Sequence, residues 1–240
     1  MNRIPTILAA LALGIAGAGQ SRAAVNITTE ASGAAGFSYW SPTIWTSFSN
    51  TGNVLLNAVP SSSAGDFARE QTTGIPAITD GIAAPLYQIN DQPNWATNHA
   101  GLATTDSSNT VTYTFGTPVV LTSIELLGGW PDAGRSDAQF SAAYSTDGVN
   151  YTTLGTAAQN IGGTGAVAWR ATLTDVTPTI GNNALITGLR FTFANGDNGY
   201  QGLTEIAAYG TAVPEPGACA FLGLALPVLL GSRRRARRAA

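Results

Sequence analysis

The chain has 240 residues, which is enough for one domain of ordinary size together with segments removed at its ends. It contains no lysine, and five of its eleven arginines lie in the last eight positions, so residues 25–212 combine four arginines with thirteen carboxylates and carry a net charge near −9. This acidic body argues against a nucleic-acid partner, which requires a basic surface. The body also has no cysteine, so no disulfide stabilises it.

The first 23 residues have the pattern of a secretory signal peptide. Arg3 supplies a positive charge, residues 4–18 form an apolar run, and Ser21-Arg22-Ala23 places small residues at the cleavage positions. We therefore expect a signal helix at residues 1–23, its removal by signal peptidase, and export of the remaining chain. A buried N-terminal helix is the alternative.

Residues 25–63 are polar and rich in glycine and serine, and they contain a cluster of aromatic residues. We expect the cluster to pack against the domain; an exposed platform is the alternative, since aromatic side chains bring large contact area at low entropic cost. The members of the cluster are Phe37, Tyr39, Trp40, Trp45 and Phe48. Residues 64–71 form the only plausible helical turn of the body.

Residues 110–115 and 119–127 alternate apolar and polar positions, which predicts two half-buried strands. The faces predicted to be buried consist of Val111, Tyr113 and Phe115 in the first strand and Val120, Thr122, Ile124 and Leu126 in the second. The opposite face of the second strand carries Ser123 and Glu125.

Residues 138–145 continue the alternation, with Phe140, Ala142 and Tyr144 on one face, and Asp147-Gly148 follows. An Asp-Gly pair between two strand-like runs supplies the positive φ angles of a tight hairpin. Later strand-like runs occupy residues 167–173, 188–193 and 203–210. Seven or eight short strands separated by turns predict an all-β, antiparallel sandwich or barrel.

Six features in a fixed order resemble the discoidin, or coagulation-factor type C, domain of the galactose-binding-like group. They are Thr79-Asp80-Gly81, Trp95, the strand pair at 110–127, the hairpin at 142–154, ITGLRFTF at 186–193 and LTEIAAYG at 203–210. The resemblance covers about residues 75–210 and implies a jelly-roll β-sandwich for residues 24–212. The chain has Thr114-Phe115-Gly116 where this family usually has Asp-Leu-Gly.

The resemblance also implies a ligand site on loops at one end of the sandwich. The candidates in this chain are Trp130, Arg135, Asn195, Asp197 and Tyr200. An aromatic ring can stack on a sugar face while amide, carboxylate and guanidinium groups bind its hydroxyls, so extracellular polysaccharide is the expected partner. The alternative is that the tryptophan packs at the rim and the arginine pairs with a loop carboxylate.

A structural calcium ion is the only cofactor that the resemblance implies. It places Asp80 and Glu205 at the ion, together with backbone oxygens, and hard cations prefer such oxygen ligands. The alternative is a turn aspartate and an exposed strand glutamate, with no cofactor.

Catalysis lacks its usual residues, so we expect no enzyme. His99 is the single histidine, which excludes a multi-histidine metal site, and no nucleophile-elbow motif accompanies it. We expect Asp132 and Asp137 to be solvated loop acids; a glycoside hydrolase that uses these two carboxylates is the weaker alternative.

The C-terminal segment, residues 213–240, closely resembles the PEP-CTERM sorting signal of bacteria. The motif Val213-Pro214-Glu215-Pro216 precedes an apolar run at 217–231 and a cluster formed by Arg233, Arg234, Arg235, Arg237 and Arg238. The resemblance implies processing by a membrane exosortase, and the arginines would hold the end of the chain at the cytoplasmic side. A helix of 15 residues spans about 22 Å, short for a hydrocarbon core of about 30 Å, so we expect transient insertion of a hydrophobic helix rather than a permanent anchor.

Together these observations predict an exported cell-surface or extracellular-matrix protein that binds envelope or extracellular polysaccharide. A structural matrix protein without a dedicated ligand is the alternative.

Overall fold

The computed structural model describes residues 24–33, 47–68, 72–83, 86–87, 96–97, 100–103, 109–130, 137–159, 166–174, 183–194 and 199–214. The strands are β1 (Ala24–Gly33), β2 (Ser62–Ala64), β3 (Leu86–Tyr87), β4 (Ala96–Thr97), β5 (Ala100–Ala103), β6 (Asn109–Trp130), β7 (Ala138–Ser145), β8 (Thr152–Gln159), β9 (Ala166–Thr174), β10 (Ile186–Phe193) and β11 (Tyr200–Ala212). A short 3-10 helix, η2, spans Ile75–Thr79. The all-β prediction is confirmed.

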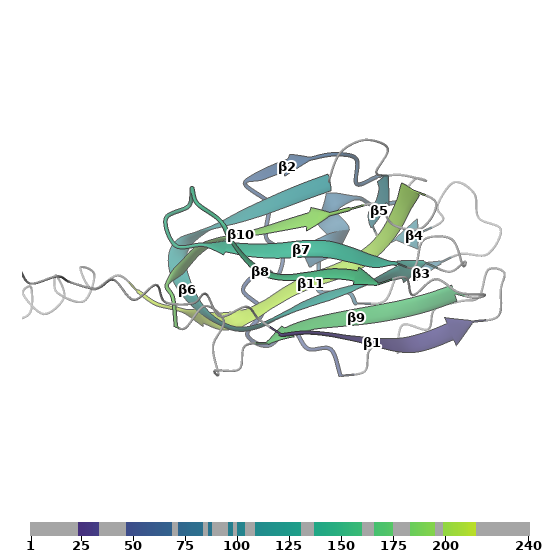
Figure 1. Ribbon diagram of the computed structural model, residues 1–240, viewed down its shortest axis with the longest axis horizontal. Coiled ribbons are helices and arrows are strands. Elements are labelled where there is room, and N and C mark those ends of the chain that lie inside the picture. Colours follow the sequence, from purple (N-terminus) through teal and green to yellow (C-terminus); the bar gives the residue numbers. More distant parts are fainter. Residues whose placement is uncertain are drawn as a thin grey trace, which may run out of the picture.

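One curled, nine-stranded sheet is built around the 22-residue strand β6. The first half of β6 pairs with β2 and with β10, and the sheet continues from β10 through β7 to β8. The second half of β6 pairs with β11, which leads to β5, and with β9, which leads to β1. Every pairing is antiparallel. Figure 1 shows β7, β8 and β10 in the upper half of the sheet and β9 and β1 in the lower half.

The two halves of the sheet enclose a single hydrophobic core. Phe140 of the upper half stacks on Trp169 of the lower half, with ring centroids 6.2 Å apart. Tyr113 and Phe191 meet edge to face within the upper half, and both are buried. Because the buried aromatic rings come from both halves, the core closes only when the sheet is curled.

The alternation predicted for the first half of β6 is confirmed at Val111 and Tyr113, and that of β7 is confirmed at Phe140 and Ala142, whereas Phe115 and Tyr144 are only half-buried. The alternation predicted for the second half of β6 is wrong at two positions. Leu121 and Ile124 are buried, whereas Thr122 is exposed and Val120 is only half-buried. A β-bulge explains this, since Tyr209 pairs with Ser123 and Gly210 pairs with Leu121, which leaves one extra residue in β6. An extra residue reverses which side chains face the core.

The hairpin predicted at Asp147-Gly148 is confirmed between β7 and β8, with a loop of six residues rather than a two-residue turn. Gly148 has φ +77°, as the motif predicts. Both Asp147 carboxylate oxygens accept hydrogen bonds inside the loop: the backbone N–H groups of Val149 and Asn150 donate to Oδ1 over 2.8 and 2.7 Å, and the side-chain amide of Asn150 donates to Oδ2 over 2.7 Å. These donors hold the pKa of Asp147 well below its usual range.

The helical turn expected at residues 64–71 is wrong for its described part, since Ala64 belongs to β2; the helical segment is η2 instead. The signal helix, the hydrophobic helix at 217–231, the arginine cluster and the aromatic cluster apart from Phe48 lie outside the described residues. Within the described residues, no helix combines the length and the apolar character needed to cross a membrane.

The connections between strands define two opposite ends of the domain. The strand ends that flank residues 104–108, 131–136, 160–165 and 195–198 all lie at one end, which we call the loop end. At the opposite end, the bend end, β6 turns at residues 115–118, the β7–β8 hairpin projects, and the chain leaves the domain after β11 (Figure 1).

Candidate functional site

The strand pairing brings the flanks of both predicted ligand segments to the loop end. Trp130 is the last residue of β6 and pairs with Val167, and Tyr200 is the first residue of β11 and pairs with Ala103. The N–H of Ala194 donates to the carbonyl of Gln139 over 3.2 Å, so the end of β10 lies directly beside the start of β7. The strand ends that flank residues 131–136 therefore lie beside those that flank residues 195–198, although about 65 positions separate the two segments.

The predicted ligand residues themselves are only partly described. The backbone of Trp130 ends β6, and the side chain of Tyr200 is half-buried and already has an interaction within the protein. Arg135, Asn195 and Asp197 lie outside the described residues. Whether these five side chains contact a ligand stays a prediction.

The carboxylates proposed for hydrolysis do not form a described pair. Asp137 is buried, with 3% of its surface exposed, so the expectation of a solvated loop acid is wrong for this residue. The amide of Gln139 donates to its Oδ2 over 3.5 Å. Asp132 and His99 lie outside the described residues, so the absence of catalysis stays a prediction.

The two residues expected at a calcium ion do lie together. Glu205, in β11, is fully buried, and the N–H of Gly81 donates to its Oε2 over 2.9 Å. Asp80 directly follows η2, and its Oδ1 accepts the N–H of Ile82 over 2.8 Å. The alternative of an exposed strand glutamate is therefore wrong for Glu205.

Gly81 makes this close approach possible. Its φ is +82°, and a Cβ at this position would lie 2.6 Å from the amide nitrogen of Asn50 and 2.7 Å from a methyl group of Leu56. Only glycine adopts this backbone conformation readily and leaves that space empty. The turn can then direct its N–H at the carboxylate.

The electrostatics of this pair are unusual for a strand glutamate. Burial raises the pKa of Glu205 to about 9; the N–H of Gly81 opposes the increase, and the Asp80 carboxylate adds to it. Burial also raises the pKa of Asp80, against the hydrogen bond from Ile82. The other Glu205 oxygen, Oε1, is buried without a hydrogen-bond partner. Such a carboxylate is stabilised by a proton or by a cation.

The donor set fits a calcium ion in part. A buried carboxylate oxygen without a partner, next to a second carboxylate, is the kind of ligand that calcium takes. The described residues contain no group of three or more histidine, cysteine, aspartate or glutamate side chains that could hold a metal. An ion would therefore need backbone carbonyls and water to complete its six to eight oxygen ligands.

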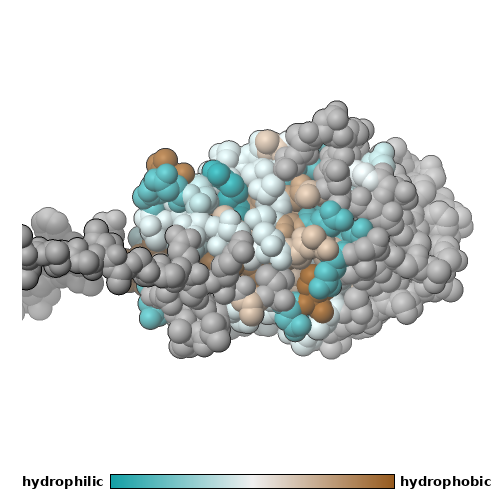
Figure 2. All heavy atoms as spheres, viewed as in Figure 1, coloured by the Kyte–Doolittle hydropathy of each residue, from teal (hydrophilic) through white to brown (hydrophobic). Residues whose placement is uncertain are grey.

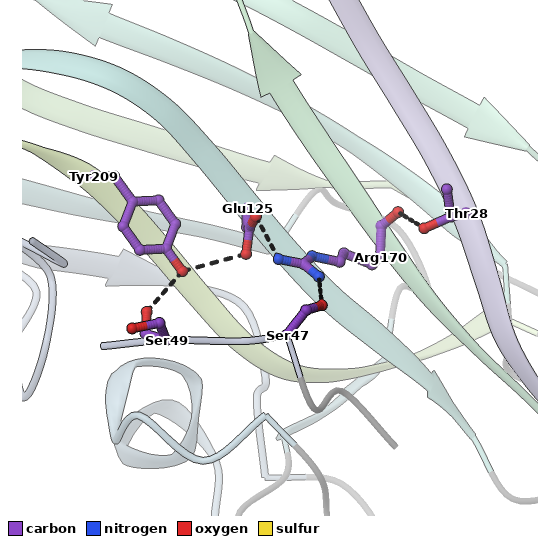
Figure 3. A network of polar contacts seen from close by, with 6 residues as sticks. All are labelled: Thr28, Ser47, Ser49, Glu125, Arg170 and Tyr209. Carbon is purple, nitrogen blue, oxygen red and sulfur yellow. Dashed lines mark hydrogen bonds and ion pairs between the residues drawn. The ribbon is translucent and has the colours of Figure 1, made fainter. Parts of the chain in front are cut away.

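A second polar network, which the sequence did not predict, lies on the outer face of the lower half (Figure 3). Glu125 of β6 and Arg170 of β9 form an ion pair of 2.6 Å, with 11% and 16% of their side chains exposed. The Tyr209 hydroxyl lies 3.2 Å from Glu125 Oε2 and 3.0 Å from the carbonyl of Ser49. Arg170 Nη1 donates to Ser47 Oγ over 2.8 Å.

This network fastens residues 47–50 onto the sheet. Burial, together with the Glu125 carboxylate, raises the pKa of Tyr209, so its hydroxyl stays a donor. The positive and negative side chains satisfy each other, which indicates a structural role. Alternation predicts that Glu125 lies on the face opposite Ile124 and Leu126, but its ion pair with Arg170 depends on β6 and β9 being neighbours.

No protein-family model matches the chain, and no curated protein matches it. The solved structures similar to it include the CBM32-1 and CBM32-2 domains of Clostridium perfringens ZmpB in complex with GalNAc. That structure has 14% identity and a TM-score of 0.47, and the match covers 80% of this chain and 40% of that chain. The C-terminal domain of a Bacteroides fragilis chitobiase has 14% identity and a TM-score of 0.43, covering 68% of this chain and 97% of that one. A CBM32-4 domain produced by Clostridium perfringens has 14% identity and a TM-score of 0.40, covering 65% and 98%. TM-scores below 0.5 at this identity assign no function to the chain.

Proposed function

We propose that this chain is a non-catalytic, galactose-binding-like β-sandwich that binds extracellular polysaccharide at its loop end. The observation that supports the proposal is the convergence of strand ends: Trp130 and Tyr200 terminate the neighbouring strands β6 and β11, and Ala194 at the end of β10 is hydrogen-bonded to Gln139 of β7. The residues flanked by these ends include Arg135, Asn195 and Asp197.

The chemistry of these side chains suits a sugar. A tryptophan ring offers a large flat contact surface to the C–H face of a hexose. Amide groups donate hydrogen bonds to its hydroxyls or accept them, and carboxylates accept them. The body carries a net charge near −9, which disfavours a polyanionic ligand. A neutral polysaccharide is therefore the expected partner.

A glycan array probed with residues 24–212 tests this function, and it should include N-acetylgalactosamine glycans. We expect Trp130→Ala to weaken binding roughly tenfold or more, because it removes the stacking surface. Tyr151→Ala is the matched control: it removes an aromatic ring at the bend end, where Tyr151 lies under Arg190, and binding should be unchanged.

Two results would contradict the proposal. Folded protein that binds no glycan, with Trp130→Ala changing nothing, favours a structural matrix protein without a ligand. Release of reducing sugar that is lost in Asp132→Asn favours hydrolysis.

We also propose that a calcium ion binds beside Asp80 and Glu205 and stabilises the fold. Support comes from the unpartnered Oε1 of Glu205 and from the second carboxylate next to it. Ion binding would keep Glu205 ionised inside the domain. A calcium titration followed by thermal unfolding tests this: no rise in melting temperature at millimolar calcium removes the site.

The export and sorting steps complete the proposal. The signal peptide would direct export, and the C-terminal segment would insert transiently in the membrane until an exosortase cuts at the Pro-Glu-Pro motif. In support, β11 ends at Ala212, and Val213 donates to Pro118 over 2.8 Å, so the motif begins where the folded domain ends. Mass spectrometry of the surface-extracted protein tests both cuts, and a protein that retains residues 217–240 contradicts sorting.

A further inference from the structure

Exposed hydrophobic side chains gather at the bend end of the domain. Five large hydrophobic side chains are exposed in the part of the chain that the structure describes, and three of them are Val59, Val149 and Leu185, with exposed fractions of 87%, 75% and 49%. Figure 2 shows hydrophobic atoms at the upper left of the described surface, at the end where β11 finishes in Figure 1.

The strand pairing places Leu185 and the hairpin that carries Val149 at this end, although they come from separate connections. Val119 pairs with both Ile186 and Ala212, so Leu185 lies next to the place where β11 ends. Gly188 pairs with Ser145, the last residue of β7, so the hairpin that carries Val149 projects from the same end.

An open, mainly apolar pocket of about 520 Å³ lies at the same end of the domain. Its lining includes Val59, Phe115, Val119 and Ala212. Immediately beyond Ala212, the N–H of Val213 donates to the carbonyl of Pro118 over 2.8 Å. The polypeptide therefore leaves the domain at the edge of this pocket, and the apolar run at 217–231 begins four residues after Val213.

We propose that the bend end of the domain rests on the surface of a lipid bilayer while the C-terminal segment is inserted. The inference rests on the tail insertion included in the proposed function. A tether of four residues reaches at most about 14 Å, so an inserted tail holds this end of the domain at the membrane and gives the apolar side chains a high effective concentration there.

A lipid surface suits this end better than a charged partner. The exposed side chains are aliphatic, and the carboxylate of Asp147 beside Val149 is directed into its own loop by the N–H groups that donate to it. The acidic body gains nothing from anionic lipid, so contact with a zwitterionic bilayer should be sufficient. The loop end then points away from the membrane, toward the matrix.

The test uses the exported chain, after removal of the signal peptide, in a Cys219→Ser background. Single cysteines replace Val59, Val149 or the exposed control Gln159 at the loop end, and each carries an environment-sensitive fluorophore. Phosphatidylcholine vesicles with brominated acyl chains then quench probes that enter the bilayer. We expect at least twofold quenching at positions 59 and 149 and none at position 159.

The outcomes distinguish contact of the bend end with the membrane from insertion of the C-terminal segment. Protein that floats with the vesicles while the probes at 59 and 149 stay unquenched overturns the membrane contact alone. Protein that does not float contradicts tail insertion and overturns both. A blue-shifted emission of the fluorophore at position 59 in the absence of vesicles also overturns the inference, because the pocket is then occupied already. If the shift depends on protein concentration, a second copy occupies the pocket. If it does not, the tail of the same chain occupies it.

Discussion

Glu205 is the residue whose protonation should control the stability of the domain. Its pKa of about 9 in the folded protein lies above its ordinary value of 4.5, so the protonated form favours folding. This stabilisation is complete below about pH 4.5 and is lost as the pH rises through about 9, when no cation is bound.

We therefore expect Glu205→Gln to stabilise the domain at pH 8 in the presence of a chelator. The amide keeps the shape and an acceptor for the N–H of Gly81 but cannot ionise. Between pH 4.5 and pH 9, each pH unit costs the wild-type protein about 1.4 kcal/mol of unfolding free energy. The variant should therefore be more stable than the wild type by a few kcal/mol at pH 8 and by close to zero at pH 5. Urea unfolding at both pH values measures it.

Millimolar calcium provides the control for this variant. The melting temperature of the wild-type protein should rise, whereas that of Glu205→Gln should not. Equal stability of both proteins at pH 8 without calcium would show that water already solvates the carboxylate.

The ion pair between Glu125 and Arg170 gives a second prediction. Glu125→Ala leaves a largely buried guanidinium group without its partner and should cost about 3 kcal/mol of unfolding free energy. The double variant Glu125→Ala/Arg170→Met should lose less than the sum of the single losses, since no unpaired charge remains. Additive losses in urea unfolding would show that the pair is not coupled.

Alternation in the sequence could predict that Glu125 leaves the core face, but it could not predict burial by residues 47–50. Asp80 and Glu205 could be associated only through a family resemblance, because 125 positions separate them. The unpartnered Oε1, the N–H of Gly81 and the role of Tyr209 depend on side-chain placement that no local pattern contains.

The β7–β8 hairpin is an element that the sequence predicts well, and it offers a clean backbone experiment. Gly148 has φ +77° and nothing within 4 Å of a Cβ, so Gly148→Ala should cost about 1 kcal/mol through backbone strain alone. Gly116 also has open space but no positive φ, and Gly116→Ala should not destabilise. Equal effects of the two variants on chemical unfolding would contradict this explanation.

Strand β6 shows where prediction from alternation fails. The pattern is correct at Val111 and Tyr113, and it is correct again at Ile124 and Leu126. Between them the bulge at Thr122 reverses the order, and the Thr122 hydroxyl donates to the carbonyl of Tyr209 over 3.1 Å. A bulge depends on the partner strand, so the residues of β6 alone do not reveal it.

For the whole domain, we expect folding to be complete at Pro214. A chain that ends there keeps every described strand and the bond from Val213 to Pro118, so its melting temperature should lie within about 2 °C of that of the longer chain. A chain that ends at Ala208 loses the pairing of β11 with Leu121, Val120 and Val119 and should unfold at clearly lower temperature. Circular dichroism melts compare the three, and a stable chain ending at Ala208 would contradict the assigned role of the last strand.

The pairing of strand β1 has a consequence for the order in which the domain can form during the proposed export. Ala24 pairs with Thr174, which is 150 positions later, and β9 is the only ladder partner of β1 among the described strands. In the proposed export the N-terminus crosses first, so the backbone groups of β1 are bonded to water rather than to β9 until most of the polypeptide has crossed. Contacts this distant in sequence fold slowly, so the protein should remain unfolded throughout translocation and close its sheet only afterwards.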